Sequence, residues 1–159
     1  VRASITGHLV LSTIHTNDSA STVTRLVDMG IESFLVAASL VGVISQRLVR
    51  RVCDKCQTKR MTNSMETKLL KLQEPCEIYE GKGCPHCNDT GYKGRIAIHE
   101  VLVMNREMRE LVDRGGSTEE LRRMASEFGT SSLRDNCIEL VLNGTTTIEE
   151  LIKITYTSD

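Results

Sequence analysis

The chain has 159 residues, a formal net charge of −1, no Trp and only two Phe and three Tyr. This length can bury one hydrophobic core with a small appendage. A near-neutral charge is unlike that of proteins that neutralise many phosphates, and the scarcity of aromatic rings argues against base stacking, so we expect no nucleic-acid partner.

The first expected element is a short strand at residues 9–14, with the sequence LVLSTI. The chain opens at Val1 without Met and runs almost at once into this strand, so we expect it to begin within a domain. A single strand is not stable alone, so it either joins a sheet with strands outside this sequence or pairs with the weaker strand candidates downstream. No basic segment leads into an apolar run with a cleavage site, so we expect a cytoplasmic protein with reduced thiols.

Two helices are expected next. The first is capped by Asn17 or Asp18 and ends at Gly30, a residue type common after helix ends. The second covers the apolar run from Phe34 to Ile44, which is hydrophobic most of the way round and should lie in the core. This run is too short to cross a bilayer, so no transmembrane segment is expected.

Residues 46–52 then predict a strand or extended arm that leads into Cys53, the first of four cysteines in two C-x2-C pairs. Two such pairs can complete one closed tetrahedral zinc site, and this is the expected role of Cys53, Cys56, Cys84 and Cys87. The alternative is a pair of disulfides. A helix at residues 64–72 lies between the pairs, and the stretch from residue 53 to residue 87 is interpreted as an excursion tied at its base by metal.

The two remaining cysteines, Cys76 and Cys137, lack partners at metal-ligand spacing and are expected to be ordinary thiols. His86 lies between two ligands and is not expected to replace one. After the metal motif, residues 94–104 predict a strand, and Asn105 predicts the cap of a helix. Three more short helices should follow, one opened by a capping box at Ser117, and we expect the four helices to form one compact bundle.

A phosphate-binding G-x-x-x-x-G-K-[ST] motif is absent from the sequence. Polar residues instead gather at the end of the first expected strand, from Ser12 to Thr16. Ligands bind outside the carboxyl ends of strands in open α/β sheets, and His15 there can donate a hydrogen bond to a phosphate or to an attacking water. The alternative is that His15 and Thr16 only satisfy backbone groups at a strand-to-helix turn.

Several motifs in order resemble the secretion ATPases of bacterial type II secretion and type IV pilus assembly. They are TGHLVLSTIHTNDSA from Thr6 to Ala20, QRLVRR from Gln46 to Arg51, the two C-x2-C pairs ending in TGYKGR from Thr90 to Arg95, and GTTTIEEL from Gly144 to Leu151. The resemblance covers nearly the whole chain and implies the C-terminal part of the motor domain, beginning just after the Walker B strand. Both branches share these motifs.

The resemblance implies an α/β fold: the C-terminal portion of a RecA-like P-loop ATPase core, a tetracysteine zinc loop and a small helical bundle. We place these parts at residues 1–52, 53–94 and 95–159. It also implies a homohexamer that hydrolyses ATP with Mg²⁺, lies in the cytoplasm peripherally on the inner membrane, and works with an inner-membrane platform protein and the cytoplasmic domain of a secretion or pilus membrane protein. Without Walker A and Walker B, the fragment alone should be inactive.

Individual residues receive roles from the same resemblance. His15 and His8 belong to a stretch that resembles the family's His box, with His15 expected as the sensor or water-orienting group and His8 as a conformational or packing partner. Thr13 and Thr16 are expected to contact the nucleotide. Arg95 resembles an arginine that contributes to contacts between protomers, and the alternative for it is a local salt bridge.

A second function class stays open, a stand-alone zinc-ribbon-like module that binds nucleic acid or acidic lipid. Its candidate surface is a set of basic side chains around the first cysteine pair: Arg47, Arg50, Arg51, Lys55, Lys59 and Arg60. A charge run of this size is usually a solvated face, and acidic residues elsewhere in the chain balance it.

Overall fold

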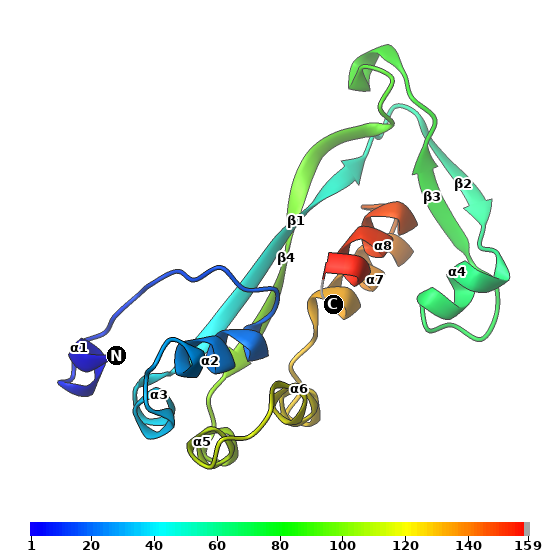
Figure 1. Cartoon of the computed structure of the whole chain (residues 1–159). Helices are drawn as coiled ribbons and strands as arrows, with labels where there is room; N and C mark the ends of the chain where they lie inside the picture. The colour runs from blue at the N-terminus through cyan, green and yellow to red at the C-terminus, as the bar shows by residue number, and fades with distance from the viewer. Residues whose placement is uncertain (158–159) are drawn as a thin grey trace. The chain divides into compact units, whose positions relative to one another are not determined.

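The structure is a computed structural model that describes residues 1–157, and it contains both helices and strands. Its residues divide into two compact units. Unit 1 comprises Val1–Ser45 and His99–Ser132, and unit 2 comprises Gln46–Ile98 and the residues from Leu133 onward. Strands β1 (Gly42–Val52) and β4 (Tyr92–Val103) pair with each other, and each contributes residues to both units (Figure 1).

Unit 1 is mainly helical. Its helices are α1 (Arg2–Ile5), α2 (Ser19–Asp28), α3 (Ser33–Ser39), α5 (Arg106–Asp113) and α6 (Thr118–Glu127). The core of this unit joins α2, α3, α5 and α6 to the end of β4, with Val23, Val36, Leu102, Met108 and Leu121 almost fully buried. Among residues 1–157, no helix is long and apolar enough to cross a membrane.

The helix starts of unit 1 follow the expected capping signals. Asp18 accepts a hydrogen bond from the Ser21 N–H at 2.6 Å and caps α2. Asn105 caps α5, and Ser117 opens α6 with a complete capping box. These three caps confirm the sequence-based helix starts, because each side chain satisfies a backbone donor that the first turn leaves unpaired.

Unit 2 combines a hairpin with a helix pair. The hairpin is β2 (Gln57–Met61) and β3 (Glu77–Gly81), which are antiparallel, with α4 (Ser64–Leu69) in the connection between them (Figure 1). A short 3-10 helix, η1 (Pro85–Cys87), precedes β4, and α7 (Leu133–Leu142) packs on α8 (Ile148–Thr157). Val49 of β1 and Ile98 of β4 are buried in the same core as Val141 and Leu151 of these two helices.

The expected strand at residues 9–14 is not formed, so this prediction is wrong for the structure. Residues 8–16 have no regular secondary structure, and Leu9 and Leu11 are 86% and 89% exposed. A strand is stable only with a partner. In the described part of the chain, each sheet contains two strands, and β1 and β4 are paired with each other.

Two other expectations need correction. The second helix ends at Ser39 rather than Ile44, because the backbone becomes extended at Leu40 and β1 begins at Gly42. Phe34 and Ile44 are 53% and 69% exposed, so only part of this run is core. The four C-terminal helices do not form a single bundle, since α5 and α6 belong to unit 1 and α7 and α8 to unit 2. The division at residues 52 and 94 stays a prediction.

Candidate functional site

Each C-x2-C pair lies at a junction between strands. Cys53 directly follows β1 and Cys56 directly precedes β2, while Cys84 and Cys87 lie between β3 and β4. Because β1 pairs with β4 and β2 pairs with β3, the two junctions are brought to the same place. A backbone hydrogen bond of 2.9 Å from the Cys53 N–H to the Gly91 carbonyl joins them. The strand pairing therefore explains how cysteines far apart in sequence meet.

The four thiols have the spacing of a tetrahedral metal site. Their sulfur atoms all lie within 4.8 Å of one another. The Cys53–Cys84, Cys56–Cys87 and Cys84–Cys87 sulfur separations are 3.9, 3.8 and 3.7 Å. A tetrahedron with metal–sulfur bonds of about 2.3 Å has edges of about 3.8 Å. All four cysteines are free thiols, which excludes the disulfide alternative in this structure, and the four together could hold a metal ion.

The surroundings of the thiols favour negative charge at one of them. The backbone N–H groups of Cys84 and Gly91 each donate to the Cys87 sulfur at 3.3 Å. Burial raises the pKa of Cys87, but these donors and the neighbouring thiols outweigh it and lower the pKa to about 6. Burial and the other thiols raise the pKa of Cys56 to about 12. Four adjacent thiols thus do not all ionise on their own, and a cation would compensate the charge of four thiolates.

Two glycines allow this junction to close. A Cβ atom on Gly81 would lie 2.0 Å from the Gly91 carbonyl oxygen, and one on Gly91 would lie 2.4 Å from the Gly81 carbonyl oxygen. Gly91 also has a positive φ of 76°. Any side chain at either position would force the second cysteine pair away from the first.

The proposed ATP-facing residues are only partly brought together. His15 is exposed and lines, with Thr16 and Asn17, a pocket of about 330 Å³ beside α2. Thr13 is exposed and does not line this pocket, and exposed His8 lies 3.1 Å from the Thr6 hydroxyl through its Nδ1 atom. Since residues 9–14 form no strand, the structure does not place His15 beyond the end of one.

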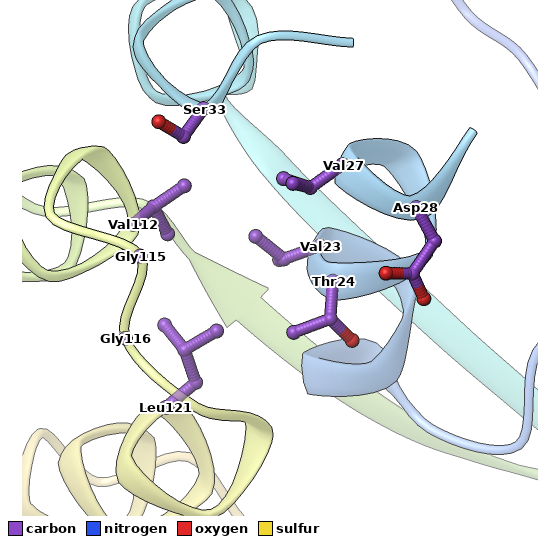
Figure 2. Close-up of a pocket in the computed structure, with 9 residues that line it drawn as sticks. All are labelled: Val23, Thr24, Val27, Asp28, Ser33, Val112, Gly115, Gly116 and Leu121. Carbon is purple, nitrogen blue, oxygen red and sulfur yellow. The ribbon is translucent and has the colours of Figure 1, made fainter. Parts of the chain in front are cut away.

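A second pocket of unit 1 also borders α2 and shares Thr24 and Asp28 with the first. Figure 2 shows Val23, Val112 and Leu121 around this space of about 190 Å³. Its hydroxyl groups are already engaged, because Thr24 accepts a hydrogen bond from Thr118 at 3.1 Å and Ser33 donates to a backbone carbonyl at 3.0 Å. This pocket is therefore mainly a gap in apolar packing.

Arg95 and the basic residues have different surroundings. Arg95 is exposed on β4 and forms no ion pair within residues 1–157, so a local salt bridge is not seen there. Arg50 instead pairs with Glu150 at 2.8 Å, Lys59 with Glu77 at 2.8 Å, and Arg60 with both Glu66 at 2.6 Å and Glu80 at 2.8 Å. These carboxylates neutralise much of the basic surface that the nucleic-acid or lipid alternative requires.

The contacts that hold the segment next to His15 were missed from the sequence. Glu100 of β4 accepts hydrogen bonds from Ser19, 81 residues away, and Arg122 of α6 pairs with Asp18. The apolar spacing of β4 and α6 predicts that these elements pack on a core, and it assigns no role to Glu100 or Arg122. No local sequence signal marks them.

The comparison with protein families identifies the class of this protein. The family described as "Type II/IV secretion system protein" matches residues 1–153. The chain therefore belongs to this family, and the resemblance inferred from its motifs is confirmed.

The relatives that it matches come from both branches of the family. It is 44% identical over 98% of its length to the type II secretion system protein HxcR of Pseudomonas aeruginosa. It is 44% identical over 94% of its length to the type IV pilus assembly ATPase PilB of Thermus thermophilus, and 42% identical over 99% to the type II secretion system ATPase E of Vibrio cholerae. The chain spans 30%, 17% and 32% of the lengths of these relatives.

Proposed function

We propose that this chain is the C-terminal part of the motor domain of a hexameric ATPase that powers type II protein secretion or type IV pilus assembly. The family match over residues 1–153, with relatives named as ATPases, is the observation that carries this proposal. The proposed core is RecA-like, and its sheet would supply the partner strands that residues 9–14 need. The proposed location is the cytoplasmic side of the inner membrane, beside a platform protein.

In this proposal, the four cysteines hold a structural Zn²⁺ ion. The sulfur separations of 3.7 to 3.9 Å fit the tetrahedral thiolate geometry that zinc prefers. Four protein ligands leave no open coordination position, so the ion would staple the junctions of β1 with β2 and of β3 with β4 rather than take part in hydrolysis. His86 is exposed and lies outside the group of four ligands.

ATP and Mg²⁺ would be bound mainly by residues outside this sequence, because the sequence contains no Walker A motif. Within the chain, His15 would orient the attacking water or sense the γ-phosphate, and Thr13 and Thr16 would contact the nucleotide. His8 would act as a conformational or packing partner. Arg95 would reach a carboxylate or phosphate of the neighbouring protomer, which its exposure and its lack of an ion pair within residues 1–157 permit.

The proposal is tested by comparing the full-length protein with this chain alone. The full-length protein should hydrolyse ATP and assemble as a hexamer, and the chain alone should bind zinc but show no ATP hydrolysis. Activity should be measured by phosphate release, and assembly by light scattering. A full-length protein that is folded and zinc-loaded but releases no phosphate would contradict the ATPase proposal.

The role of His15 has a separate test. His15→Ala in the full-length enzyme should lower kcat by about 10²-fold or more, with a smaller change in KM for ATP, because the group acts on the reacting water or phosphate. His86→Ala, which removes an exposed histidine from unit 2, is the control and should leave both constants unchanged. Equal losses of turnover and nucleotide affinity would indicate a packing role for His15 instead.

A further inference from the structure

The chain between His15 and helix α2 is held by a buried carboxylate from a distant strand. Glu100 of β4 is 8% exposed, and its Oε1 atom accepts a hydrogen bond of 2.9 Å from the Ser19 N–H and another from the Ser19 hydroxyl. Ser19 itself is 1% exposed. A carboxylate buried to this degree is retained only where its hydrogen bonds are satisfied, and Glu100 therefore fixes the first residue of α2 relative to β4.

Helix α6 holds the preceding residue through an ion pair. Arg122 donates from Nε to the Asp18 Oδ2 atom at 2.8 Å, and its Nη2 atom lies 2.6 Å from the same oxygen. The Asp18 side chain is 12% exposed and also accepts from the Ser21 N–H. Because the Ser21 N–H is bonded to Oδ1 and Arg122 to Oδ2, both carboxylate oxygens are engaged and the orientation of the Asp18 side chain is fixed.

The anchored part of the chain extends back to Thr16. The hydroxyl groups of Thr16 and Thr22 are hydrogen-bonded to each other at 2.6 Å, and their oxygens lie 3.2 and 3.1 Å from the Asp18 carbonyl oxygen, which accepts the remaining proton. Residues 8–15, in contrast, are mostly exposed and have no regular secondary structure. His15 thus directly precedes the anchored part of the chain, and it lines the same pocket as Thr16.

We propose that Glu100 and Arg122 are positioning residues for His15 and Thr16 in ATP hydrolysis. This inference rests on the proposed function, because His15 acts on a reacting water or phosphate only in that function. Displacing a reacting group by about 1 Å can cost about 10²-fold in rate. Arg122 is 43% exposed at its side chain, so its loss should affect orientation more than folding.

The test is a double-mutant cycle in the full-length enzyme, with kcat and KM for ATP measured for each variant. Arg122→Ala should lower kcat about tenfold or more with little change in KM, and it should add little to the loss already caused by His15→Ala. Arg106→Ala is the matched control, because Arg106 forms an exposed pair with Glu110 elsewhere in unit 1. It should retain the kcat of the unmodified enzyme.

A second variant separates positioning from folding. Asp18→Asn keeps a side chain that can cap α2 but removes the negative partner of Arg122, so it should reproduce the loss of kcat in an enzyme that remains folded at the assay temperature. Additive losses for Arg122→Ala and His15→Ala, or an Arg122→Ala enzyme equal to the Arg106→Ala control, would overturn the positioning role alone. An unchanged kcat in His15→Ala would overturn the proposed role of His15 and the positioning role with it.

Discussion

The four-cysteine junction of unit 2 and the polar segment of unit 1 differ in what determines their geometry. The four cysteines are placed by strand pairs that lie within the described chain, and their sulfur atoms already have metal-site spacing. Residues 9–14 have a strand-like sequence but no strand partner among residues 1–157, and all of them except half-buried Ile14 are exposed. A site at the end of paired strands is fixed by those pairs, whereas a strand-like segment takes its form only from a neighbour.

The largest expected effect comes from breaking the metal site. Cys84→Ser should lower bound zinc from about one ion per chain to almost none, and unit 2 should lose most of its protection, because metal binding is coupled to folding. Zinc is measured by atomic emission, and protection by hydrogen exchange. Cys76→Ser is the control, since Cys76 lies outside the group of four ligands. Full zinc content in Cys84→Ser, or paired oxidation of the thiols without metal, would refute the site.

A smaller effect is expected from the ion pair that ties β1 to α8 in the same unit. Glu150 has a side chain 7% exposed, accepts from the Arg50 N–H at 2.8 Å, and pairs with the Arg50 guanidinium, which stacks on the Tyr92 ring at 3.7 Å. Burial raises the pKa of Glu150, but the Arg50 and Lys153 contacts outweigh burial and lower it. Glu150→Gln should destabilise the chain by about 1–3 kcal/mol at pH 7.

The pH dependence of this pair provides the sharper measurement. Because the pKa of Glu150 is lower in the folded state than its ordinary value of 4.5, its stabilisation is present above that value and is lost as pH falls through the folded pKa. Melting temperatures from pH 6 to pH 3 should therefore fall less steeply in Glu150→Gln than in the unmodified chain. Glu139→Gln, at an exposed position of α7, should keep the original slope. Parallel slopes for all three proteins would show that Glu150 does not supply the effect.

The features predicted correctly from sequence are those with a local cause. Asp18, Asn105 and Ser117 cap helices because a short polar side chain reaches the N–H groups of its own first turn. The close approach of Cys53 and Cys56 to the second cysteine pair was also predicted, because two C-x2-C pairs are typical of a single four-thiolate metal site.

The features missed from sequence depend on distant partners. The hairpin strand β2, Gln57–Met61, has polar residues on both faces and gives no alternating signal, yet it is paired along its length with β3. The pairing of Arg50 with Glu150 joins residues 100 positions apart, and that of Arg122 with Asp18 joins residues 104 positions apart. Residue types alone do not select such partners among the many charged residues of the chain.

A modest effect is expected from the cap of α6, the helix that carries Arg122. Ser117→Ala should cost about 1 kcal/mol, because the Glu120 N–H loses its acceptor and the Glu120 carboxylate loses the hydroxyl donor of Ser117, while the bond from the backbone N–H of residue 117 is kept. Ser126→Ala, an exposed change in the last turn of the same helix, is the control and should be nearly neutral. Both values come from urea unfolding, and an equal loss in the two variants would show that the cap contributes nothing specific.

The smallest effect is expected at Leu11, and it tests the difference between the two regions directly. In this chain Leu11 is 89% exposed, so Leu11→Ala should change the unfolding free energy by less than about 0.5 kcal/mol. Leu102→Ala, at a position with no exposed surface in unit 1, is the positive control and should cost about 2–5 kcal/mol. In the full-length protein, a partner strand would bury Leu11, and Leu11→Ala should then cost about 2 kcal/mol or more. A negligible cost in both proteins would mean that residues 9–14 have no strand partner in either, and the geometry of His15 would then depend only on the anchors at Asp18 and Ser19.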